Sequence, residues 1–235
     1  MWIRILFVPI LFLTVLVPGV AFAAQLEVSG WIPYWGAATG TVDVSQHFDQ
    51  LTEVNPFGYS VKSNGTLVDT FGVERGVWPA FMAEAKKKKV RVIPTVMWSD
   101  GEAIHKILSN TEKRRALATE IADLVKKKGY DGIDINFEGK QARTKEYFSL
   151  FLKGLYTKMG NKWVMCSIEA RTPLDSRYLG TPPASATQYA NDHVQIGKYC
   201  DRVRIMAYDQ GTADLRLNST RSAPYVAVAD AAWVE

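Results

Sequence analysis

The sequence has few of the residues that build metal centres or disulfide frameworks. It contains two cysteines, Cys166 and Cys200, and three histidines that stand apart, at His47, His105 and His193. No group of them has the spacing of metal ligands, so we expect no metal and no cofactor. A disulfide between the two cysteines and a pair of buried thiols are both compatible with the sequence.

An excess of charge of one sign is also lacking. The 28 Lys and Arg side chains nearly balance the 24 Asp and Glu side chains, which leaves a formal net charge of +4. That excess is too small to predict nucleic-acid binding. The basic run at 86–89 follows a helical pattern, and we predict that it is a solvated helix end.

A third feature that the chain lacks is an apolar run long enough to span a membrane. The stretch Ile5–Val17 is followed by Pro18–Gly19, short of the roughly 20 residues that a spanning helix needs. With Arg4 before it and small residues behind it, residues 1–23 read as a secretory signal peptide. We therefore expect an exported protein, secreted or in the cell envelope. Retention of the segment as a membrane anchor is the alternative.

The remainder, residues 24–235, alternates strand and helix patterns without a linker, which predicts one domain. Short strand patterns rich in Val and Ile occur at Leu26–Trp31, Asn55–Val61, Val90–Trp98, Gly132–Phe137, Trp163–Glu169 and Arg202–Tyr208. Helical patterns occur at Trp78–Ala85, Thr111–Lys128 and Thr144–Met159, and another begins near Ser222. Strands separated by helices indicate parallel β-α units.

About six such units are visible, whereas eight would close a barrel of roughly 250 residues. We predict an α/β fold, a (β/α)8 TIM barrel that is truncated after about six units because the sequence stops inside its last helical pattern. Such a fragment would fold poorly, since it exposes two strand edges. An open six-strand sheet is the alternative, but no strand is followed by the Gly-x-Gly-x-x-Gly turn of dinucleotide-binding sheets.

The fourth strand carries polar residues where a core strand would be apolar. Asp134, Asn136 and Glu138 point to one face, and the apolar residues between them point to the other. Buried polar groups cost several kcal/mol unless they are paired. Glu138 also stands at the carboxyl end of its strand, where barrel enzymes keep their chemistry. This pattern favours a catalytic site, and an internally hydrogen-bonded polar layer is the alternative.

These residues carry a resemblance to a known family. The segment from Asp131 and Gly132 to Glu138 is similar to the Asp-x-x-Asp-x-Asp-x-Glu signature of glycoside hydrolase family 18, the chitinase-like family. Met206–Asp209 matches the family's Met-x-Tyr-Asp, and Gly30–Trp35 resembles the first strand of its bacterial branch of spore-germination and peptidoglycan-processing glucosaminidases. The resemblance covers roughly residues 28–209, and it implies that Asp131 and Gly132 belong to the structural part of the motif.

The resemblance implies a catalytic set. Glu138 would act as general acid and base, with the acetamido group of the substrate as nucleophile. Asp134 would belong to the set, and Tyr208 would hydrogen-bond the acetamido carbonyl. Asn136 stands where the family usually has Asp, which permits either a working enzyme that passes through a neutral oxazoline or a weakened one. Because Asn136 cannot share a proton with Glu138, we expect an acidic pH optimum.

Further residues are candidates for sugar binding, namely Tyr34, Trp35, Trp98, Glu169, Met206 and Asp209. Aromatic side chains suit the C–H faces of sugars, and we expect Trp35 and Trp98 on the catalytic rim because each follows or ends a strand. For Trp98 a place in the core is the alternative. Glu169 could contact substrate or pair with Arg171.

The sequence therefore predicts a glycosidase that cleaves β-1,4 bonds beside N-acetylglucosamine in peptidoglycan or chitin. Its partner would be that polysaccharide, with no nucleic acid, with a membrane only if the signal segment is retained, and with the chain as a monomer. The alternative, motivated by Asn136, is a chitinase-like lectin that binds sugar without turnover. A less favoured possibility is an unrelated α/β enzyme that holds a metal with Asp134 and Glu138.

Overall fold

The computed structural model describes residues 26–215, 228–229 and 234. The signal peptide expected at 1–23 and the helix expected near Ser222 lie outside the described residues. The strands are β1 (Ser29–Ile32), β2 (Glu53–Val61), β3 (Leu67–Val68), β4 (Arg91–Val92), β5 (Thr95–Trp98), β6 (Gly132–Phe137), β7 (Trp163–Glu169) and β8 (Arg202–Met206).

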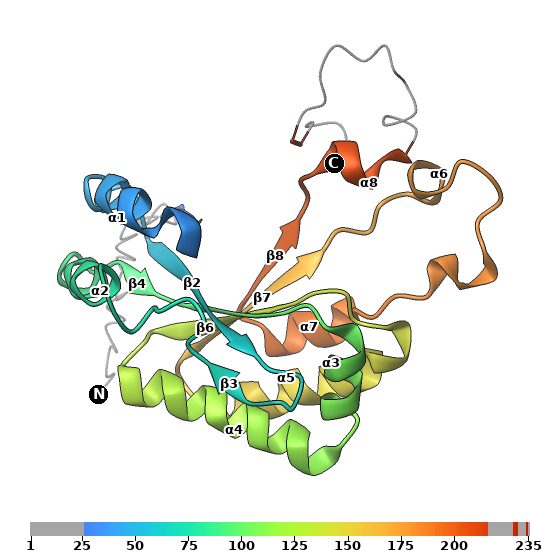
Figure 1. Cartoon of the computed structure of the whole chain (residues 1–235), viewed down its shortest axis with the longest axis horizontal. Coiled ribbons are helices and arrows are strands. Elements are labelled where there is room, and N and C mark those ends of the chain that lie inside the picture. The colour runs from blue at the N-terminus through green and yellow to red at the C-terminus, as the bar shows by residue number, and fades with distance from the viewer. Residues whose placement is uncertain (1–25, 216–227, 230–233, 235) are drawn as a thin grey trace, which may run out of the picture.

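The strands form one curled sheet with the order β1-β2-β5-β6-β7-β8. Every pair along this path is parallel, β4 adds to β2 in parallel, and β3 adds to β2 antiparallel. The sheet curls into an open half-barrel whose end strands are β1 and β8 (Figure 1). The prediction of parallel β-α units in an incomplete barrel is confirmed.

Six of the described helices pack around the sheet, namely α1 (Ala37–Ser45), α2 (Trp78–Lys87), α3 (Gly101–Leu108), α4 (Thr111–Lys128), α5 (Lys145–Met159) and α7 (His193–Tyr199). Two short helices, α6 (Leu174–Arg177) and α8 (Gln210–Ala213), lie beyond the ends of β7 and β8 (Figure 1). In Figure 1, α3, α4, α5 and α7 lie below the sheet, while α1 and α2 lie beside β2. None of the helices in the described part of the chain combines the length and apolar character of a membrane span.

The apolar core lies between the sheet and the helices that follow its strands. Ile133, Ile135 and Phe137 of β6 are fully buried, and the ring of Phe137 stacks on Phe151 of α5 with centroids 5.4 Å apart. The helix α4 contributes Leu117, Ile121 and Val125. Because strand side chains alternate in direction, Asp134 and Asn136 point to the opposite face, toward the inside of the half-barrel.

The third expected strand, Val90–Trp98, is not continuous. It divides into β4 and β5 because Pro94 has no N–H to donate to the ladder. The carbonyl of Pro94 still accepts the backbone N–H of Asp134 at 2.9 Å, so the break keeps β5 and β6 in register. β8 also ends earlier than expected, at Met206, which leaves Tyr208 on the turn behind the strand.

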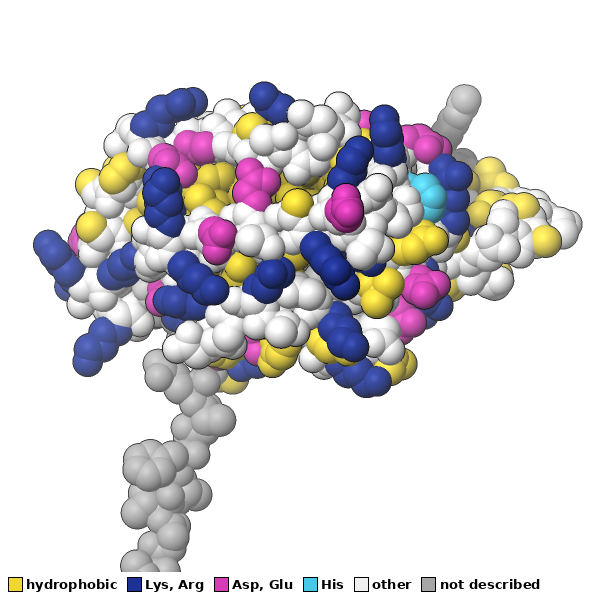
Figure 2. Space-filling view, turned by 90° about the horizontal axis from the view of Figure 1, so that it is seen from below, with side chains coloured by type: hydrophobic (Ala, Val, Ile, Leu, Met, Phe, Trp, Pro, Cys, Tyr) yellow, Lys and Arg dark blue, Asp and Glu magenta, His cyan; other side chains and the backbone are white. Residues whose placement is uncertain are grey.

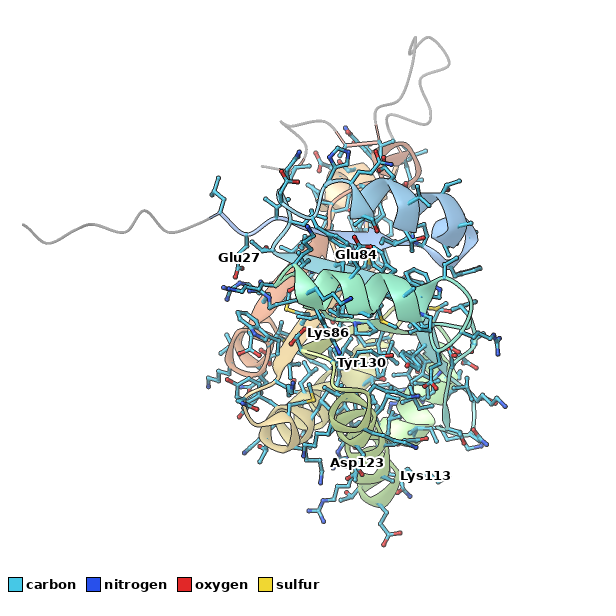
Figure 3. All side chains as sticks on the ribbon, turned by 90° about the vertical axis from the view of Figure 1, so that its left-hand side faces the viewer. Glu27, Glu84, Lys86, Lys113, Asp123 and Tyr130 are labelled. Carbon is cyan, nitrogen blue, oxygen red and sulfur yellow. A yellow bond between two sulfur atoms is a disulfide. The ribbon has the colours of Figure 1, made fainter. Side chains whose placement is uncertain are left out.

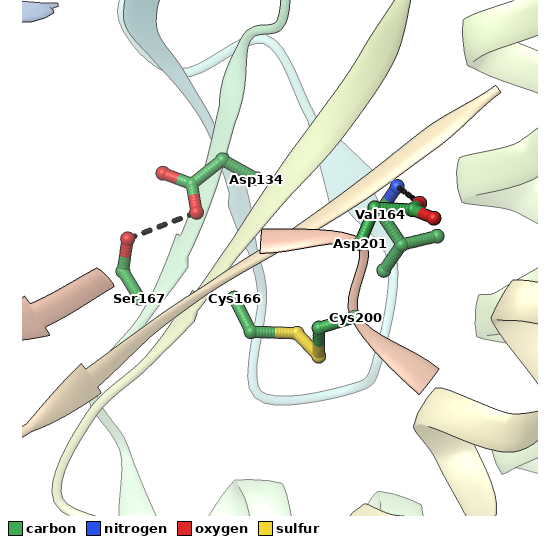
Figure 4. The surroundings of a disulfide bond; sticks show 6 residues. All are labelled: Asp134, Val164, Cys166, Ser167, Cys200 and Asp201. Atoms are coloured by element: carbon green, nitrogen blue, oxygen red, sulfur yellow. Dashed lines mark hydrogen bonds between the residues drawn. A yellow bond between two sulfur atoms is a disulfide. The ribbon is translucent and has the colours of Figure 1, made fainter. Parts of the chain in front are cut away.

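The two cysteines form a disulfide, the possibility that the sequence left open. Cys166 lies in the middle of β7, and Cys200 comes just before β8, with 5.9 Å between their Cα atoms (Figure 4). Beside it, Asp201 accepts the backbone N–H of Val164 at 2.7 Å. These two links fasten the start of β8, the end strand of the sheet, to β7.

The basic run at 86–89 is exposed and ends α2. Its first member, Lys86, donates to the carbonyl of Gly129 at 2.7 Å and lies 6.0 Å from the ring centroid of Tyr130 (Figure 3). On the face seen from below, Lys and Arg side chains alternate with Asp and Glu side chains and do not form one basic patch (Figure 2). The surface charge of this face is therefore mixed, in keeping with the small net charge.

Candidate active site

A pocket of about 330 Å³ opens at the carboxyl ends of the parallel strands. Its lining comes from the segments that follow β6, β7 and β8, and consists of Glu138, Glu169, Ala170, Thr172, Met206, Tyr208 and Asp209. Catalytic groups of parallel β/α barrels gather at this edge. The fold thus brings together Glu138 with four of the other candidates from distant parts of the sequence.

Asp134 lies under this pocket, fully buried inside the half-barrel. Its carboxylate accepts hydrogen bonds from Trp31 Nε1 at 3.0 Å, from Thr95 Oγ1 at 2.9 Å and from Ser167 Oγ at 2.9 Å. The guanidinium of Arg204 is 3.6 Å away. Four neighbouring strands therefore hold this carboxylate in place, which satisfies the requirement that a buried charge be paired. Figure 4 shows its bond to Ser167.

Asn136 and Glu138 are hydrogen-bonded to each other. The amide nitrogen of Asn136 donates to Glu138 Oε1 at 2.8 Å. Asn136 is almost fully buried, and among the described residues its amide oxygen finds no hydrogen-bond partner. A buried acceptor without a partner is costly. This amide oxygen lies two residues before Glu138 on the same face of β6. A ligand N–H would be bound at this place.

Tyr208 lies beside the same carboxylate. Burial raises the pKa of its hydroxyl, and the negative charges of Glu138, Asp209 and Asp134 raise it further. The hydroxyl therefore stays protonated and available as a donor. The next residue, Asp209, adopts a left-handed conformation with φ of 57°, which Asp tolerates better than most residues. This turn ends β8 and keeps both side chains at the pocket.

Glu169 uses both carboxylate oxygens within the protein. Oε1 accepts the backbone N–H of Gly139 at 2.8 Å, and Oε2 accepts from Asn191 Nδ2 at 2.9 Å and lies 3.3 Å from Lys140 Nζ. Burial raises its pKa, but the charge of Lys140 and these hydrogen bonds outweigh burial, so the net shift is downward. The pair with Arg171, one of the two possibilities that the sequence left open, is absent from the described contacts, and Arg171 instead packs on Tyr189 with 4.3 Å to the ring centroid.

The aromatic candidates divide into two groups. Tyr34 and Trp35 follow β1 at the same edge of the sheet, with Trp35 75% exposed and Tyr34 stacked on Phe71 at 3.8 Å. They do not line the pocket that holds Glu138. The expectation that Trp98 lies on the rim is wrong. Its side chain alternates to the outer face of β5, where it is buried against Phe137 at 5.4 Å.

Asp131 and Gly132 lie at the opposite, amino-terminal end of β6. Asp131 accepts the backbone N–H of Val92 at 2.8 Å. A Cβ on Gly132 would lie 2.3 Å from the carbonyl oxygen of Trp163, closer than atoms can approach. Both residues therefore serve the packing of β6 between its neighbours, far from the pocket.

Sequence reasoning missed several residues of the site. Lys140 and Asn191 bind Glu169, and Phe71 supports Tyr34. Strand parity could have found the partners of Asp134, because Thr95 is its register partner on β5. Nothing in the sequence marks Lys140, since a lysine after a strand normally lies in solvent.

Metal binding has no support in the geometry. Among the residues that the structure describes, no three or more His, Cys, Asp or Glu side chains are arranged to hold a metal ion. Asp134, which the metal hypothesis required, directs its oxygens to Trp31, Thr95 and Ser167. The chemistry that the site can perform is therefore that of an acid, Glu138, flanked by an amide and a phenol.

Comparisons with known proteins agree with this arrangement. Residues 30–232 match the profile described as Glycosyl hydrolases family 18. The chain is 26% identical over 167 residues to the uncharacterized glycosylase YvbX of Bacillus subtilis (strain 168). The matched region covers 65% of this chain and 46% of that protein. The chain thus spans about half the length of this curated relative.

Solved structures share the fold. A chitinase from Bacteroides thetaiotaomicron superposes with a TM-score of 0.62 at 20% identity, covering 79% of this chain and 54% of that chain. The spore cortex-lytic enzyme SleL of Bacillus cereus superposes with a TM-score of 0.61 at 18% identity, covering 79% of this chain and 42% of that chain. At these identities the likeness shows the fold alone.

Proposed function

The chain belongs to glycosyl hydrolases family 18, and on this premise we propose that it cleaves β-1,4 linkages beside N-acetylglucosamine in peptidoglycan or chitin. In this proposal, Glu138 acts as general acid and base. The observation that carries it is the pairing of Asn136 with Glu138, which leaves the buried amide oxygen of Asn136 free to accept a ligand N–H. An acetamido sugar supplies such a donor next to its reacting carbon.

The proposed reaction proceeds in two steps with retention. First, Glu138 gives its proton to the glycosidic oxygen while the acetamido oxygen attacks the anomeric carbon, so the glycosidic bond breaks and an oxazoline ring forms. Second, Glu138 takes a proton from water, and the water oxygen attacks the same carbon and opens the ring. The Asn136 amide, which donates to Glu138 Oε1 at 2.8 Å, would keep this hydrogen bond to the carboxylate that is left between the two steps.

Asn136 and Tyr208 would hold the acetamido group for this attack. The Asn136 oxygen would accept its N–H, and the Tyr208 hydroxyl, which stays protonated because its pKa is raised, would donate to its carbonyl oxygen. Asn136 cannot offset positive charge as a carboxylate does, and its amide oxygen cannot take up the N–H proton. The intermediate would therefore be a neutral oxazoline only if this proton passes to solvent water as the ring closes, and the nitrogen regains a proton from water when the ring opens. Asp209 and Met206 line the same pocket and would contact the sugar ring.

The substrate and the compartment are parts of the same proposal. Exposed Trp35, with Tyr34 behind it, offers an apolar platform for a further sugar unit at the same edge of the sheet. The disulfide between Cys166 and Cys200 suits an oxidising compartment, which supports export to the cell envelope or beyond.

The test is an incubation of the full chain with chitin oligosaccharides and with purified peptidoglycan, followed by mass spectrometry of the products. We expect new reducing ends at N-acetylglucosamine, and a loss of about 10² to 10⁴ in rate for Glu138→Gln, which cannot donate a proton. Intact glycans with a folded wild-type chain would refute hydrolysis.

A second candidate, a sugar-binding protein without turnover, rests on the specific observation that Asn136 stands beside the acid in place of a carboxylate. Isothermal titration with chitin oligosaccharides separates the two. Binding without any product would establish the lectin, whereas binding with product release would establish the hydrolase.

A further inference from the structure

Sheet hydrogen bonds hold the proposed acid from one side only. Glu138 comes directly after β6 and donates its backbone N–H to the carbonyl of Trp98 on β5 at 2.8 Å. On the other side, β6 pairs with β7 from Gly132 to Ile135, so this pairing ends three residues before Glu138. Some other contact must therefore fix this side of the turn.

Lys140 and Glu169 occupy that side. Lys140 Nζ donates to the carbonyl of Phe137, the residue before the acid. Glu169 Oε1 accepts the backbone N–H of Gly139, the residue after it, at 2.8 Å. The two side chains join each other through Nζ and Oε2 at 3.3 Å. Together they bind the peptide groups on both sides of Glu138.

The turn itself depends on this support. Gly139 has φ of 64°, the left-handed region that favours glycine. It is exposed, and the close packing that it has is on the side of Ser99 and Gly101, away from β7. The carboxylate of Glu169, placed at the end of β7, therefore replaces the ladder hydrogen bonds that are missing between the diverging ends of β6 and β7.

Burial makes the arrangement unusual. The side chain of Lys140 is fully buried, with Nζ 4.8 Å from the ring centroid of Phe148. Burial lowers the pKa of this lysine, and the charges of Glu169 and Glu138 oppose the shift. A buried ammonium is costly unless it is paired. Its partner Glu169 is oriented in turn by Asn191 Nδ2 at 2.9 Å.

We propose that Lys140 and Glu169 form a positioning pair that aims the Glu138 carboxyl at the glycosidic oxygen. The inference rests on the proposed function of Glu138. It assigns Glu169 to the support of the acid instead of to the sugar. Because a misplacement of about 1 Å can cost about 10²-fold in rate, loss of the pair should lower kcat while substrate binding is retained.

The experiment compares the full wild-type chain with Lys140→Met, Glu169→Gln and the double variant. Each is assayed for kcat and KM on N-acetylglucosamine tetramer, for its thermal midpoint, and for hydrogen exchange at the Gly139 amide. Glu102→Gln is the matched control, because Glu102 pairs with exposed Arg143 next to the same turn and does not touch the pocket.

We expect each single variant to lose about 10-fold or more in kcat with KM within about 2-fold, and Lys140→Met to exchange the Gly139 amide faster. The double variant leaves no buried charge unpaired, so its thermal midpoint should be higher than those of the single variants, while its kcat stays low. If kcat of the double variant rises together with its thermal midpoint, the pair has only a structural role and the proposal is overturned.

Two other outcomes would also overturn it. A raised KM with unchanged kcat in Glu169→Gln would make Glu169 a sugar ligand, and unchanged protection of Gly139 in Lys140→Met would show that the turn needs no such support. A wild-type chain without activity on both the tetramer and purified peptidoglycan would count against the proposed function instead. The exchange measurement then still decides whether the pair holds the turn.

Discussion

At the level of single residues, Asn136 is the direct neighbour of the proposed acid. Its amide donates to Glu138 Oε1 at 2.8 Å, and an amide has no proton to share with a carboxyl. An Asp at this position would share one proton with Glu138, since two carboxylates this close cannot both ionise freely. The residue that departs from the family signature therefore controls the pH range of the reaction.

The variant Asn136→Asp tests this reading. We expect the alkaline limb of its kcat profile to move to higher pH, because the shared proton is held more tightly than in the wild type. The measurement is the rate on N-acetylglucosamine tetramer between pH 4 and pH 9. Asn136→Leu, which removes the acceptor as well, is the control and should lose activity at every pH. An unchanged alkaline limb in Asn136→Asp would contradict proton sharing.

Tyr208 acts as a donor in the proposed site, and Tyr208→Phe removes only its hydroxyl. We expect kcat to fall by about 10²-fold, as when a preorganised donor to a developing charge is removed. The raised pKa of Tyr208 means that its hydroxyl remains a donor up to and beyond pH 10, so a wild-type rate loss below that pH would come from other groups.

The matched control for that measurement is Tyr156→Phe. Tyr156 lies on α5, its ring is tilted against that of Tyr199 with centroids 6.2 Å apart, and it is not part of the pocket. Equal losses in the two variants would show that the effect of Tyr208→Phe is on folding and not on the acetamido group.

At the level of elements, local signals predicted the best-defined segments. The helix Thr111–Lys128 was predicted with its observed bounds from its apolar stripe and from Gly129, which ends it with φ of 63°. The structure adds the cap at the other end, where Asn110 accepts the N–H of Lys113 at 3.0 Å. β6 and β7 were predicted correctly because their apolar runs are short and bounded by turn residues. The face that carries Asp134 and Asn136 followed from strand parity alone.

Other elements depend on contacts that sequence patterns do not reveal. α1, α3 and α7 were not predicted, and each is at most nine residues long, too short for a clear helical period. Trp98 was placed on the rim because it ends a strand, yet parity turns it to the outer face against Phe137. The buried position of Lys140 depends on the divergence of β6 from β7, which is a property of the curled sheet.

The disulfide links two elements, β7 and the start of β8, across 34 residues. Its loss in a Cys166→Ala, Cys200→Ser variant should lower the free energy of unfolding by about 3–4 kcal/mol, mainly because the unfolded chain gains freedom. Urea unfolding measures this change. Reductant should lower the stability of the wild type toward that of the variant and leave the variant unaffected. A variant as stable as the wild type would contradict the link.

At the level of the whole molecule, side chains bridge the two ends of the open sheet. In the described part of the chain, β1 and β8 do not pair with each other. Arg204 of β8 nevertheless donates to Ser29 Oγ at 3.1 Å and to Asn55 Oδ1 at 2.9 Å, and it also pairs with buried Glu53. These polar contacts cross the inside of the half-barrel at its amino-terminal end and limit how far the sheet can open.

Glu27 extends this bridge toward the surface. It accepts from Arg202 NH2 at 2.9 Å and from Arg91 NH2 at 3.3 Å. The hydrogen bond from Arg202 lowers the pKa of Glu27, burial opposes this, and the charges of Arg202 and Arg91 lower it further. A carboxyl whose folded pKa is depressed stabilises the fold above its unfolded pKa and loses that effect as pH falls through the folded value.

Glu27→Gln should therefore lower the thermal midpoint by roughly 1–3 °C at pH 7 and have a smaller effect at pH 3, because the wild-type carboxyl takes up its proton as the pH falls through its lowered pKa. Glu84→Gln, which removes an exposed carboxylate of α2 (Figure 3), is the control and should change neither value. Glu27 joins the segment before β1 to β8. A drop in the thermal midpoint that is larger at pH 7 than at pH 3 would therefore mean that charge holds the ends of the sheet together. An equal loss at both pH values would assign the effect to packing instead of charge.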